Sequence, residues 1–135
     1  MNNTELINKA LSAREKSYSP YSDFAVGAAL LCKNGKVYSG CNIENSGYSS
    51  TNCAERTAFF KAVSEGETEF VKIAVVGGHK NKPIDNYCSP CGICRQVMKE
   101  FCKPDFEIIM AKSEDDFISM TLSELLPMAF DKREV

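Results

Sequence analysis

Apolar residues recur every three or four positions at the start of the chain, which is the spacing of one face of an α-helix. The residues on this face are Leu6, Ile7, Ala10 and Leu11. They predict a helix over residues 4–16, and Asn2 or Asn3 supplies a side-chain oxygen that suits its N-cap. Residues 17–23 are rich in serine, proline and tyrosine, so we expect a turn to end the helix there.

A hairpin of two strands is predicted next. Residues 24–33 are apolar at successive positions, which is typical of a strand buried on both faces. Asn34-Gly35 follows, a dipeptide that favours a two-residue hairpin turn, and residues 36–42 form the predicted return strand. Residues 43–52 are polar and rich in Asn, Ser and Gly, so we expect a loop, the kind of segment that carries function on a rigid scaffold.

The rest of the chain alternates between apolar strands and amphipathic helices. The predicted elements are a helix over 53–64, a strand over 71–76, a loop over 77–89, a helix over 91–101, strands over 106–111 and 117–121, and a short helix over 123–126. The succession β-β-α-β-α-β predicts a mixed sheet, with strand 71–76 expected to be parallel to a neighbour. Because helices must cover both faces of such a sheet, the expected fold is α/β, a three-layer α/β/α sandwich with a central mixed β-sheet.

Composition narrows the classes of partner. The 135 residues predict a single domain over 1–135, and a hydrophobic content of 44% predicts a packed core. A net charge of −2 without a basic block argues against long nucleic acid, so a small uncharged substrate fits better. No apolar run is long enough to span a membrane, and no secretion signal opens the sequence. We therefore expect a cytoplasmic protein that does not bind membranes.

Three of the seven cysteines belong to a pattern that suits a catalytic metal ion. Without a secretion signal, so many cysteines favour metal binding or catalysis over disulfide bonds. Cys53 precedes Glu55 by two residues, and Pro90 is followed by Cys91-Gly92-Ile93-Cys94. Three thiolates hold Zn²⁺ and leave its fourth position open to water, and a carboxylate beside them can move that water's proton.

Both cysteine elements stand at predicted helix starts. A helix N-terminus carries partial positive charge, which lowers thiol pKa values and favours the thiolate that binds metal. Two helix starts at the same end of adjacent βα units converge, so Cys53 is expected to meet Cys91 and Cys94. Three thiolates give the zinc centre a formal charge of −1, which an arginine near sulfur would offset. Arg56 is the better candidate and Arg95 the weaker; the alternative for each is a solvated helix arginine.

Other side chains leave alternatives open. His79 or Cys88 would complete a purely structural zinc site as a fourth ligand, although His79 falls in a polar loop and the helix start favours Cys91 over Cys88. Cys91 and Cys94 alone would also suit a redox dithiol. The remaining cysteines lie in or beside apolar segments and are expected in the core: Cys32, Cys41 and Cys102.

The chain resembles the small, single-domain cytidine deaminases over nearly its whole length. The segments that carry the resemblance are 18–22 (YSPYS) with 24–30 (FAVGAAL), 42–45 (NIEN) with Tyr48, 53–56 (CAER), 89–96 (SPCGICRQ), and 125–127 (LLP) with Phe130. The spacing of cysteine and glutamate is that of zinc nucleobase deaminases. The loop from His79 to Cys88 is a few residues longer than we expect for the family.

This resemblance implies the metal and the acid–base residue of the site. Cys53, Cys91 and Cys94 would bind Zn²⁺, and Glu55 would transfer protons. The implied reaction is hydrolytic deamination of cytidine or deoxycytidine to uridine or deoxyuridine with release of ammonia, in pyrimidine salvage. The alternatives are a deaminase of another nucleoside and a non-enzymatic structural zinc module.

The resemblance also implies how a nucleoside would bind. Asn42 and Glu44 would hydrogen-bond the ribose 3′-hydroxyl, Phe24 would pack against the nucleoside, and the backbone around Ala54 would contact the base. Two more aromatic residues are placed at the substrate by the family match, Tyr48 and Phe130. Phe130 would reach the site of a neighbouring subunit, because the family is commonly a homotetramer with sites at subunit boundaries.

Overall fold

The computed structural model describes residues 1–132, so the last three residues of the predicted domain lie outside it. Its elements are α1 (Asn3–Arg14), β1 (Phe24–Cys32), β2 (Val37–Cys41), η1 (Tyr48–Ser50), α2 (Ala54–Ser64), β3 (Phe70–His79), α3 (Gly92–Phe101), β4 (Glu107–Ser113), β5 (Asp116–Thr121) and α4 (Leu122–Leu125). Within the described residues, no helix has the length and apolar character that crossing a membrane requires. The succession of helices and strands is the predicted one, with boundaries that differ by a few residues.

The five strands form one mixed sheet in the order β2-β1-β3-β4-β5. β1 is antiparallel to both β2 and β3, β3 is parallel to β4, and β5 is antiparallel to β4. The strand predicted over 71–76 extends to His79, because Gly78 and Gly77 pair with Ala25 and Val26 of β1. The prediction of a loop over 77–89 was therefore wrong at its first three residues.

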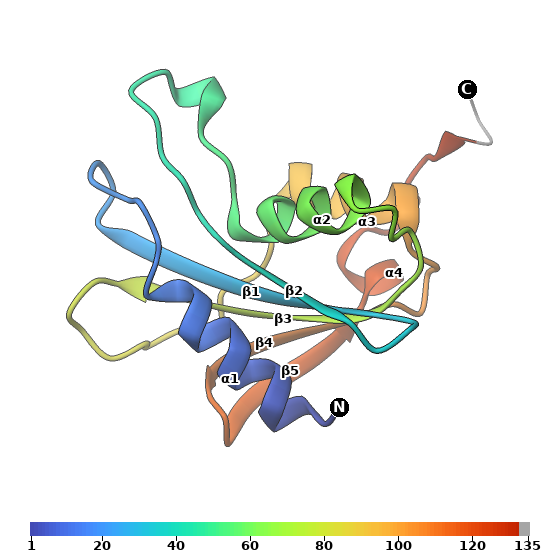
Figure 1. Ribbon diagram of the computed structural model, residues 1–135, viewed down its shortest axis with the longest axis horizontal. Coiled ribbons are helices and arrows are strands. Elements are labelled where there is room, and N and C mark those ends of the chain that lie inside the picture. Colours follow the sequence, from blue (N-terminus) through green and yellow to red (C-terminus); the bar gives the residue numbers. More distant parts are fainter. Residues whose placement is uncertain (133–135) are drawn as a thin grey trace.

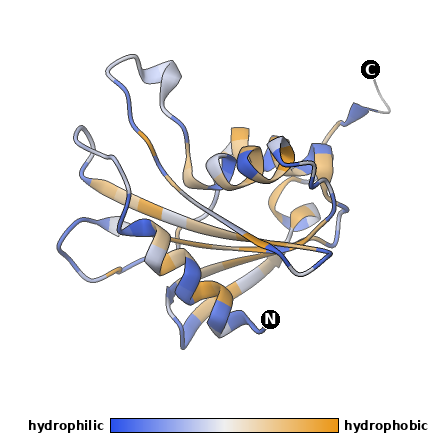
Figure 2. Cartoon of the chain, viewed as in Figure 1, coloured by the Kyte–Doolittle hydropathy of each residue, from blue (hydrophilic) through white to orange (hydrophobic). Residues whose placement is uncertain are grey.

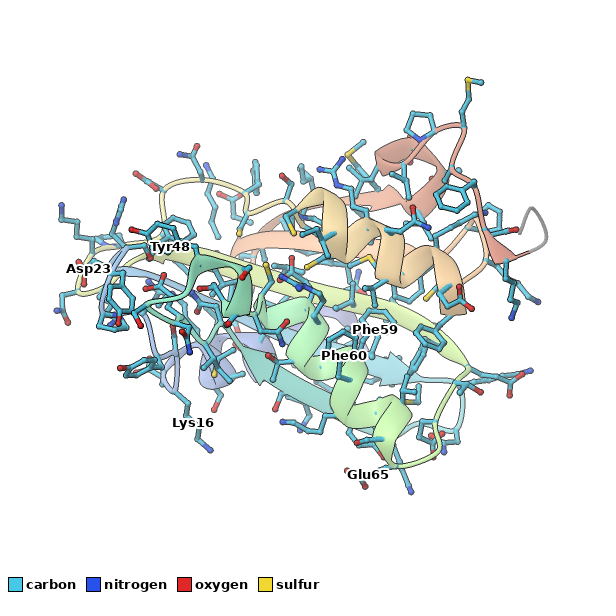
Figure 3. The ribbon with its side chains drawn as sticks, turned by 90° about the horizontal axis from the view of Figure 1, so that it is seen from above. Lys16, Asp23, Tyr48, Phe59, Phe60 and Glu65 are labelled. Atoms are coloured by element: carbon cyan, nitrogen blue, oxygen red, sulfur yellow. The ribbon has the colours of Figure 1, made fainter. Side chains whose placement is uncertain are left out.

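Helices cover both faces of this sheet, which confirms the three-layer α/β/α architecture. Figure 1 shows α1 on one face and α2, α3 and α4 on the other. The hydrophobic side of α1 faces the strands (Figure 2), with Leu6, Ile7 and Ala10 fully buried against residues of β1, β3 and β4. The core on the opposite face is centred on Phe59 of α2, whose ring lies 5.0 Å from that of Phe70. In α2 the neighbouring Phe60 is half exposed (Figure 3).

Two glycines let helices approach the sheet closely. A Cβ atom at Gly27 of β1 would lie 2.1 Å from the Ala10 carbonyl oxygen of α1. A Cβ atom at Gly40 of β2 would lie 2.6 Å from the Ala54 carbonyl oxygen, in the first turn of α2. Because no side chain fits at Gly40, the first turn of α2 lies directly on the edge strand.

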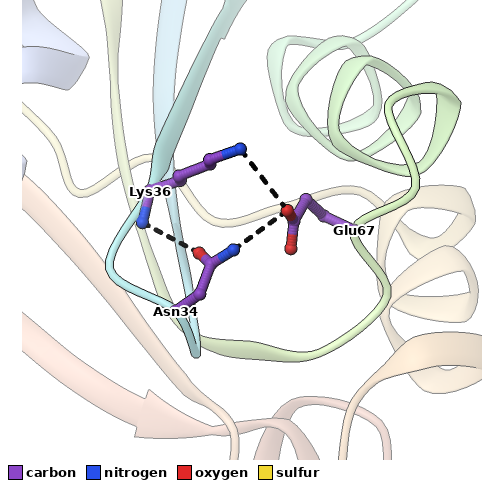
Figure 4. A network of polar contacts seen from close by, with 3 residues as sticks. All are labelled: Asn34, Lys36 and Glu67. Atoms are coloured by element: carbon purple, nitrogen blue, oxygen red, sulfur yellow. Dashed lines mark hydrogen bonds and ion pairs between the residues drawn. The ribbon is translucent and has the colours of Figure 1, made fainter.

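The turn between β1 and β2 is tied to the segment that follows α2. The Asn34 amide nitrogen donates to Glu67 Oε1 at 2.9 Å, and Lys36 Nζ lies 3.8 Å from the same oxygen (Figure 4). Asn34 Oδ1 also accepts from the Lys36 backbone N–H, while Gly35 takes a φ of 94° that suits glycine. The predicted Asn-Gly turn is thus present.

Candidate metal centre

Two helix N-termini present the three cysteines. Cys53 is the N-cap of α2 and Cys91 is the N-cap of α3, both with extended backbone dihedral angles. Cys94 lies in the first turn of α3, and its backbone N–H donates to Cys91 Sγ at 3.5 Å. The prediction that both cysteine elements begin helices is confirmed, and the partial positive charge of both termini falls on the same cluster of sulfurs.

The sulfur atoms have the spacing that zinc requires. Cys91 Sγ lies 3.7 Å from Cys53 Sγ and 3.5 Å from Cys94 Sγ, and all three sulfurs lie within 4.8 Å of one another. Tetrahedral Zn²⁺ with bonds of about 2.3 Å separates its sulfur ligands by about 3.8 Å, so the three residues fit the ion.

The metal-capable group contains three ligands and no more. Among residues 1–132, the histidine, cysteine and carboxylate ligand atoms that gather at this point are those of Cys53, Cys91 and Cys94. Cys88 and His79, the two candidates for a fourth ligand, are outside the group. A structural zinc site therefore lacks its fourth protein ligand in the described part of the chain, whereas a catalytic site needs that position open.

Arg56 contacts the cluster and Arg95 does not donate to it. Arg56 Nη2 donates to Cys53 Sγ at 3.3 Å, one helical turn along α2. Arg95 instead donates to two backbone carbonyl oxygens, those of Pro90 at 2.8 Å and Leu125 at 2.7 Å. Of the two arginines considered as a counter-charge, Arg56 is the one placed to offset the thiolates.

In the absence of metal the sulfurs share protons unevenly. A hydrogen bond from the Cys94 thiol, with a further one from Arg56, lowers the pKa of Cys53 to about 5. The same hydrogen bond raises the pKa of Cys94, which remains the protonated partner. The cluster is therefore prepared to hold negative charge at Cys53, the sulfur next to the arginine.

Glu55 is a buried carboxylate in the first turn of α2, with 3% of its surface exposed. Burial raises its pKa to about 7, and the nearby Cys53 charge adds to the shift. A hydrogen bond from its own backbone N–H opposes this shift only in part. Burying a carboxylate with so little compensation is costly, which indicates a chemical role rather than a contribution to stability.

Asn42 is oriented from the interior of the protein. Its Oδ1 accepts from the Val26 backbone N–H at 2.9 Å and from Ser17 Oγ, and its Nδ2 donates to the Phe24 carbonyl oxygen at 2.8 Å. An amide group has two N–H donors, so these contacts use one and leave the other. The side chain is therefore fixed in one orientation with a donor to spare.

Glu44 is fixed from the loop that precedes β1. Its Oε1 accepts from the backbone N–H groups of Tyr21 at 2.9 Å and Ser22 at 3.1 Å, and its Oε2 accepts from Ser22 Oγ. Although desolvation opposes the change, the hydrogen bonds from Ser22 and Tyr21 lower the pKa of Glu44. The carboxylate is charged and retains unused lone pairs.

The remaining predicted substrate residues occupy three regions of the chain. Phe24 meets the His79 ring edge to face at 5.3 Å, and Ala54 is buried next to Cys53. Tyr48 is 84% exposed on η1, at the end of the molecule opposite Glu65 (Figure 3). Phe130 is 57% exposed on the C-terminal tail, and its carbonyl oxygen accepts from Gln96 Nε2 in the middle of α3 at 3.2 Å. Of these residues, Ala54 is the one directly beside a cysteine of the cluster.

Sequence reasoning missed the serines that orient these polar groups. Ser22 holds Glu44 and Ser17 holds Asn42, although neither serine was assigned a role of its own from the sequence. Short hydroxyl side chains in turns often bond to neighbouring groups, but their partners here lie more than twenty positions away. No local pattern identifies such a pairing.

The other four cysteines differ in their surroundings. Cys32 is in the core as predicted. Cys102 is half-buried and packs against the same core. Cys41 is a correction: it is half-buried at the end of edge strand β2, where its thiol donates to the Lys16 carbonyl oxygen. Burial raises the pKa of Cys88 to about 12, with Glu55 and Cys53 adding to it, so Cys88 is a protonated thiol near the site.

The metal centre is open at the surface of the single chain. Cys91 is exposed and Cys53 is half-buried. Two hollows of about 430 Å³ lie elsewhere, one beside Arg14 and Lys80 and the other between Lys16 and Lys61. Neither hollow includes a residue of the cysteine cluster.

Comparison with known proteins agrees with this geometry. A family model for the cytidine and deoxycytidylate deaminase zinc-binding region matches residues 1–110. Cytidine deaminases from Sporosarcina psychrophila and Halalkalibacterium halodurans are each 50% identical to the chain, with matches that span 97% and 100% of it and 93% and 98% of the relatives. The crystal structure of cytidine deaminase from Burkholderia pseudomallei superposes with a TM-score of 0.87 at 47% identity, over 96% of this chain and 100% of that one.

These matches cover almost the whole chain. They include the segments that carry the three cysteines, Glu55 and Arg56, and also the strands and helices around them. The same cysteines are the group that fits a zinc ion in the structure. The chain therefore belongs to the cytidine and deoxycytidylate deaminase family of zinc-binding enzymes.

Proposed function

We propose that this chain, as one domain over residues 1–135, is a zinc-dependent cytidine deaminase acting in pyrimidine salvage. It hydrolyses cytidine and deoxycytidine to uridine and deoxyuridine and releases ammonia. The observation that carries this proposal is the position of Glu55, a buried carboxylate two residues from one sulfur of a cluster with zinc spacing. Zn²⁺ bound by the three cysteines supplies a water molecule with a pKa lowered toward neutrality.

Glu55 transfers the protons of the reaction. It accepts a proton from the attacking water and gives it to ring N3, which makes C4 of the pyrimidine electrophilic. The C4–O bond then forms. Glu55 takes the second proton from this new hydroxyl group and delivers it to the amino group, so that the C4–N bond breaks, the C4 carbonyl of the product forms and ammonia leaves. General acid–base transfer of this kind contributes about 10²–10⁴ in rate. The raised pKa of Glu55 suits a group that must both accept and donate near neutral pH.

Arg56 offsets the charge of the thiolates. Three thiolates exceed the charge of Zn²⁺ by one, and the guanidinium of Arg56 donates to Cys53 Sγ. A hydrogen bond to sulfur draws electron density away from the metal and restores its ability to acidify water.

The ribose is held by Asn42 and Glu44. Asn42 has an unused N–H donor and Glu44 has unused lone pairs, so one hydroxyl can accept from the first and donate to the second. We assign the ribose 3′-hydroxyl to this pair, a group that cytidine and deoxycytidine share. Phe24 and Tyr48 pack against the nucleoside, and the backbone at Ala54 contacts the base beside the metal.

The working enzyme is a homotetramer in which Phe130 completes the site of a neighbouring subunit. The support is that the metal centre is open in the single chain, while Phe130 is exposed and its carbonyl oxygen accepts from Gln96 Nε2 of α3 at 3.2 Å. Large apolar side chains also remain exposed on the same side of the molecule, among them Phe60 of α2 and Ile93 of α3. Such surfaces are typical of interaction sites.

The proposed setting is the cytoplasm, because a zinc centre made of three thiolates needs reduced cysteines and that compartment keeps thiols reduced. The proposed substrate is a small nucleoside, and a chain with a net charge of −2 is not suited to binding the phosphates of long nucleic acid.

One experiment tests the function and its alternatives together. Zinc content and ammonia release from cytidine are measured on the same sample, before and after chelation. We expect about one zinc per chain, ammonia release, and loss of both on chelation. Zinc without ammonia from cytidine or any other nucleoside would indicate a structural module, ammonia from a different nucleoside alone would indicate another deaminase, and thiol-dependent redox activity without zinc would indicate a dithiol protein.

A further inference from the structure

The loop between β3 and α3 carries one zinc ligand to the metal centre. It occupies residues 80–91, contains no helix or strand, and ends at Cys91, the exposed member of the cluster. Cys53 and Cys91 are the N-caps of α2 and α3, and Cys94 lies within α3. Asn52, next to Cys53, is paired with Ile43 by two backbone hydrogen bonds of 2.9 Å. No such bridge precedes Cys91 in the described part of the chain, so the position of Cys91 depends more on what restrains the 80–91 loop.

Tyr87 attaches this loop to the far edge of the sheet. Its hydroxyl group donates to Asp116 Oδ1 at 2.6 Å, and Lys112 Nζ lies 4.6 Å from the centre of its ring. Asp116 begins β5 and Lys112 is near the end of β4, so both partners flank one tight hairpin. A hydrogen bond to a carboxylate is stronger than one between neutral groups. The Lys112 ammonium group adds a cation–π attraction to the tyrosine ring.

The hairpin is itself fixed on its other side. Asn8 Nδ2 of α1 donates to Glu114 Oε2 at 2.8 Å, which ties the turn to the first helix. The attachment point of Tyr87 is thus connected to α1, a helix that packs on the sheet through Leu6, Ile7 and Ala10.

Two further contacts restrain the loop from inside. Cys88 packs against the core, and its Sγ would lie only 2.8 Å from a Cβ atom at Gly77 of β3. Ile84 packs against the core on the α1 face. Next to Cys91, the Pro90 carbonyl oxygen accepts from Arg95 Nε of α3 at 2.8 Å. Tyr87, four residues before Cys91, is the side chain that attaches the loop to the sheet by a polar contact.

We propose that Tyr87 is a positioning residue for the zinc centre, holding the 80–91 loop so that Cys91 Sγ stays within bonding geometry of the ion. The inference rests on the proposed zinc-dependent function. Without the attachment the loop gains conformational freedom, and closing the site on the ion must then remove that freedom. The cost falls on metal retention, because Cys91 is the ligand that the loop delivers.

The test measures how fast the zinc-loaded enzyme releases its metal to an excess of a chromogenic chelator. Tyr87→Phe removes the hydroxyl group and keeps the ring. We expect release about three- to tenfold faster, less than the value of a buried hydrogen bond to a charged group, because Tyr87 and Asp116 are both exposed to solvent. Asp116→Ala should accelerate release to a similar degree, and the double variant should release no faster than the quicker single variant. Asp115→Ala is the matched control, because Asp115 is an exposed carboxylate in the same hairpin.

Each outcome is decisive for Tyr87. Parent-like release from Tyr87→Phe, with or without a lower Tm, would overturn the proposal, as would equal acceleration by Asp115→Ala. Cobalt-substituted Tyr87→Phe should retain the thiolate charge-transfer bands of the parent, since all three cysteines still bind; a lost thiolate band would mean that the substitution disrupts the centre rather than loosening it, and would also overturn the proposal. If the parent deaminates cytidine with zinc but Tyr87→Phe releases zinc at the parent rate, the role of Tyr87 is refuted and the proposed function stands. If the parent binds no zinc, the proposed function itself is refuted.

Discussion

The Arg56 guanidinium, in the first turn of α2, donates a hydrogen bond at 3.3 Å to Sγ of Cys53, the N-cap of that helix. The arrangement follows from helix geometry, because residues three apart lie on one face. The Arg56 Nε atom is buried and has no partner among the described residues, so its side chain is held beside sulfur at some cost. A cation kept in such a place is best explained by the excess negative charge of three thiolates.

Arg56→Gln should reduce kcat while zinc stays bound. Removing the counter-charge leaves the thiolates to oppose acidification of the water, and we expect a loss of about 10- to 100-fold, as for other residues that bond to metal ligands. Arg95→Gln is the control, because Arg95 donates to backbone carbonyl oxygens. Its loss should lower Tm and leave kcat close to the parent value. Steady-state kinetics with cytidine and zinc analysis check this; a parent-like kcat for Arg56→Gln would exclude the role.

Glu55→Ala should keep the fold and about one zinc per chain but lose turnover. The carboxylate is not a ligand of the cluster, so its removal leaves the three sulfurs in place. We expect kcat to fall by at least about 10²–10⁴, the usual contribution of a general acid–base group. Glu55→Gln, which keeps the shape, should still bind cytidine. An active Glu55→Ala enzyme would refute proton transfer by this residue.

Glu55 should also make the stability of the zinc-free, reduced protein depend on pH. Burial raises its folded pKa to about 7 from an ordinary value of 4.5, so its contribution is fully present below pH 4.5 and is lost as the pH rises through 7. The shift corresponds to about 3 kcal/mol of unfolding free energy, which Glu55→Gln does not lose. Denaturant unfolding of parent and variant at pH 4.5 and 8 should show the difference growing in favour of the variant. If the unfolding free energies of parent and Glu55→Gln differ by the same amount at both pH values, the pKa of Glu55 is not raised in the folded protein.

Glu44→Ala should raise KM for cytidine by about ten- to hundredfold, the value of a hydrogen bond to a charged group. The lost partner is the ribose 3′-hydroxyl, so 3′-deoxycytidine serves as a matched substrate that lacks it. The parent should show a high KM for 3′-deoxycytidine, and Glu44→Ala should discriminate less between the two nucleosides, because Asn42 alone then binds the 3′-hydroxyl. Free cytosine should be a poor substrate for both proteins. If Glu44→Ala and the parent have the same KM for cytidine, Glu44 does not bind the ribose.

The sequence predicted those features that local patterns encode. Asn34-Gly35 specifies its own turn, and the helix starts at Cys53 and Cys91 follow from apolar spacing with Pro90 before the second. The extension of β3 to His79 was missed because Gly77 and Gly78 have little strand propensity, and pairing with β1 overrides it.

Some residues of the site could likewise be identified from local patterns, and others only from the structure. The three cysteines and Glu55 were identified from spacing, whereas the choice of Arg56 over Arg95 needed the positions of Pro90 and Leu125, which take up the second arginine. The contact of Tyr87 with Asp116 links residues that no periodicity relates. Contacts between distant segments are decided by the packing of the whole sheet.

Mixed oligomers should show whether neighbouring subunits share a site. Glu55→Ala lacks the proton-transfer group but keeps Phe130, and Phe130→Ala has the opposite defect, so each homotetramer should have low activity. In a hybrid, a site with Glu55 from one chain and Phe130 from its neighbour is complete. Mixing the two variants under conditions that exchange subunits should therefore restore activity to about a quarter of the parent value if the site joins two chains with random assembly. Activity that stays at the average of the two separate variants, with exchange verified by mass spectrometry, would place Phe130 outside the neighbour's site.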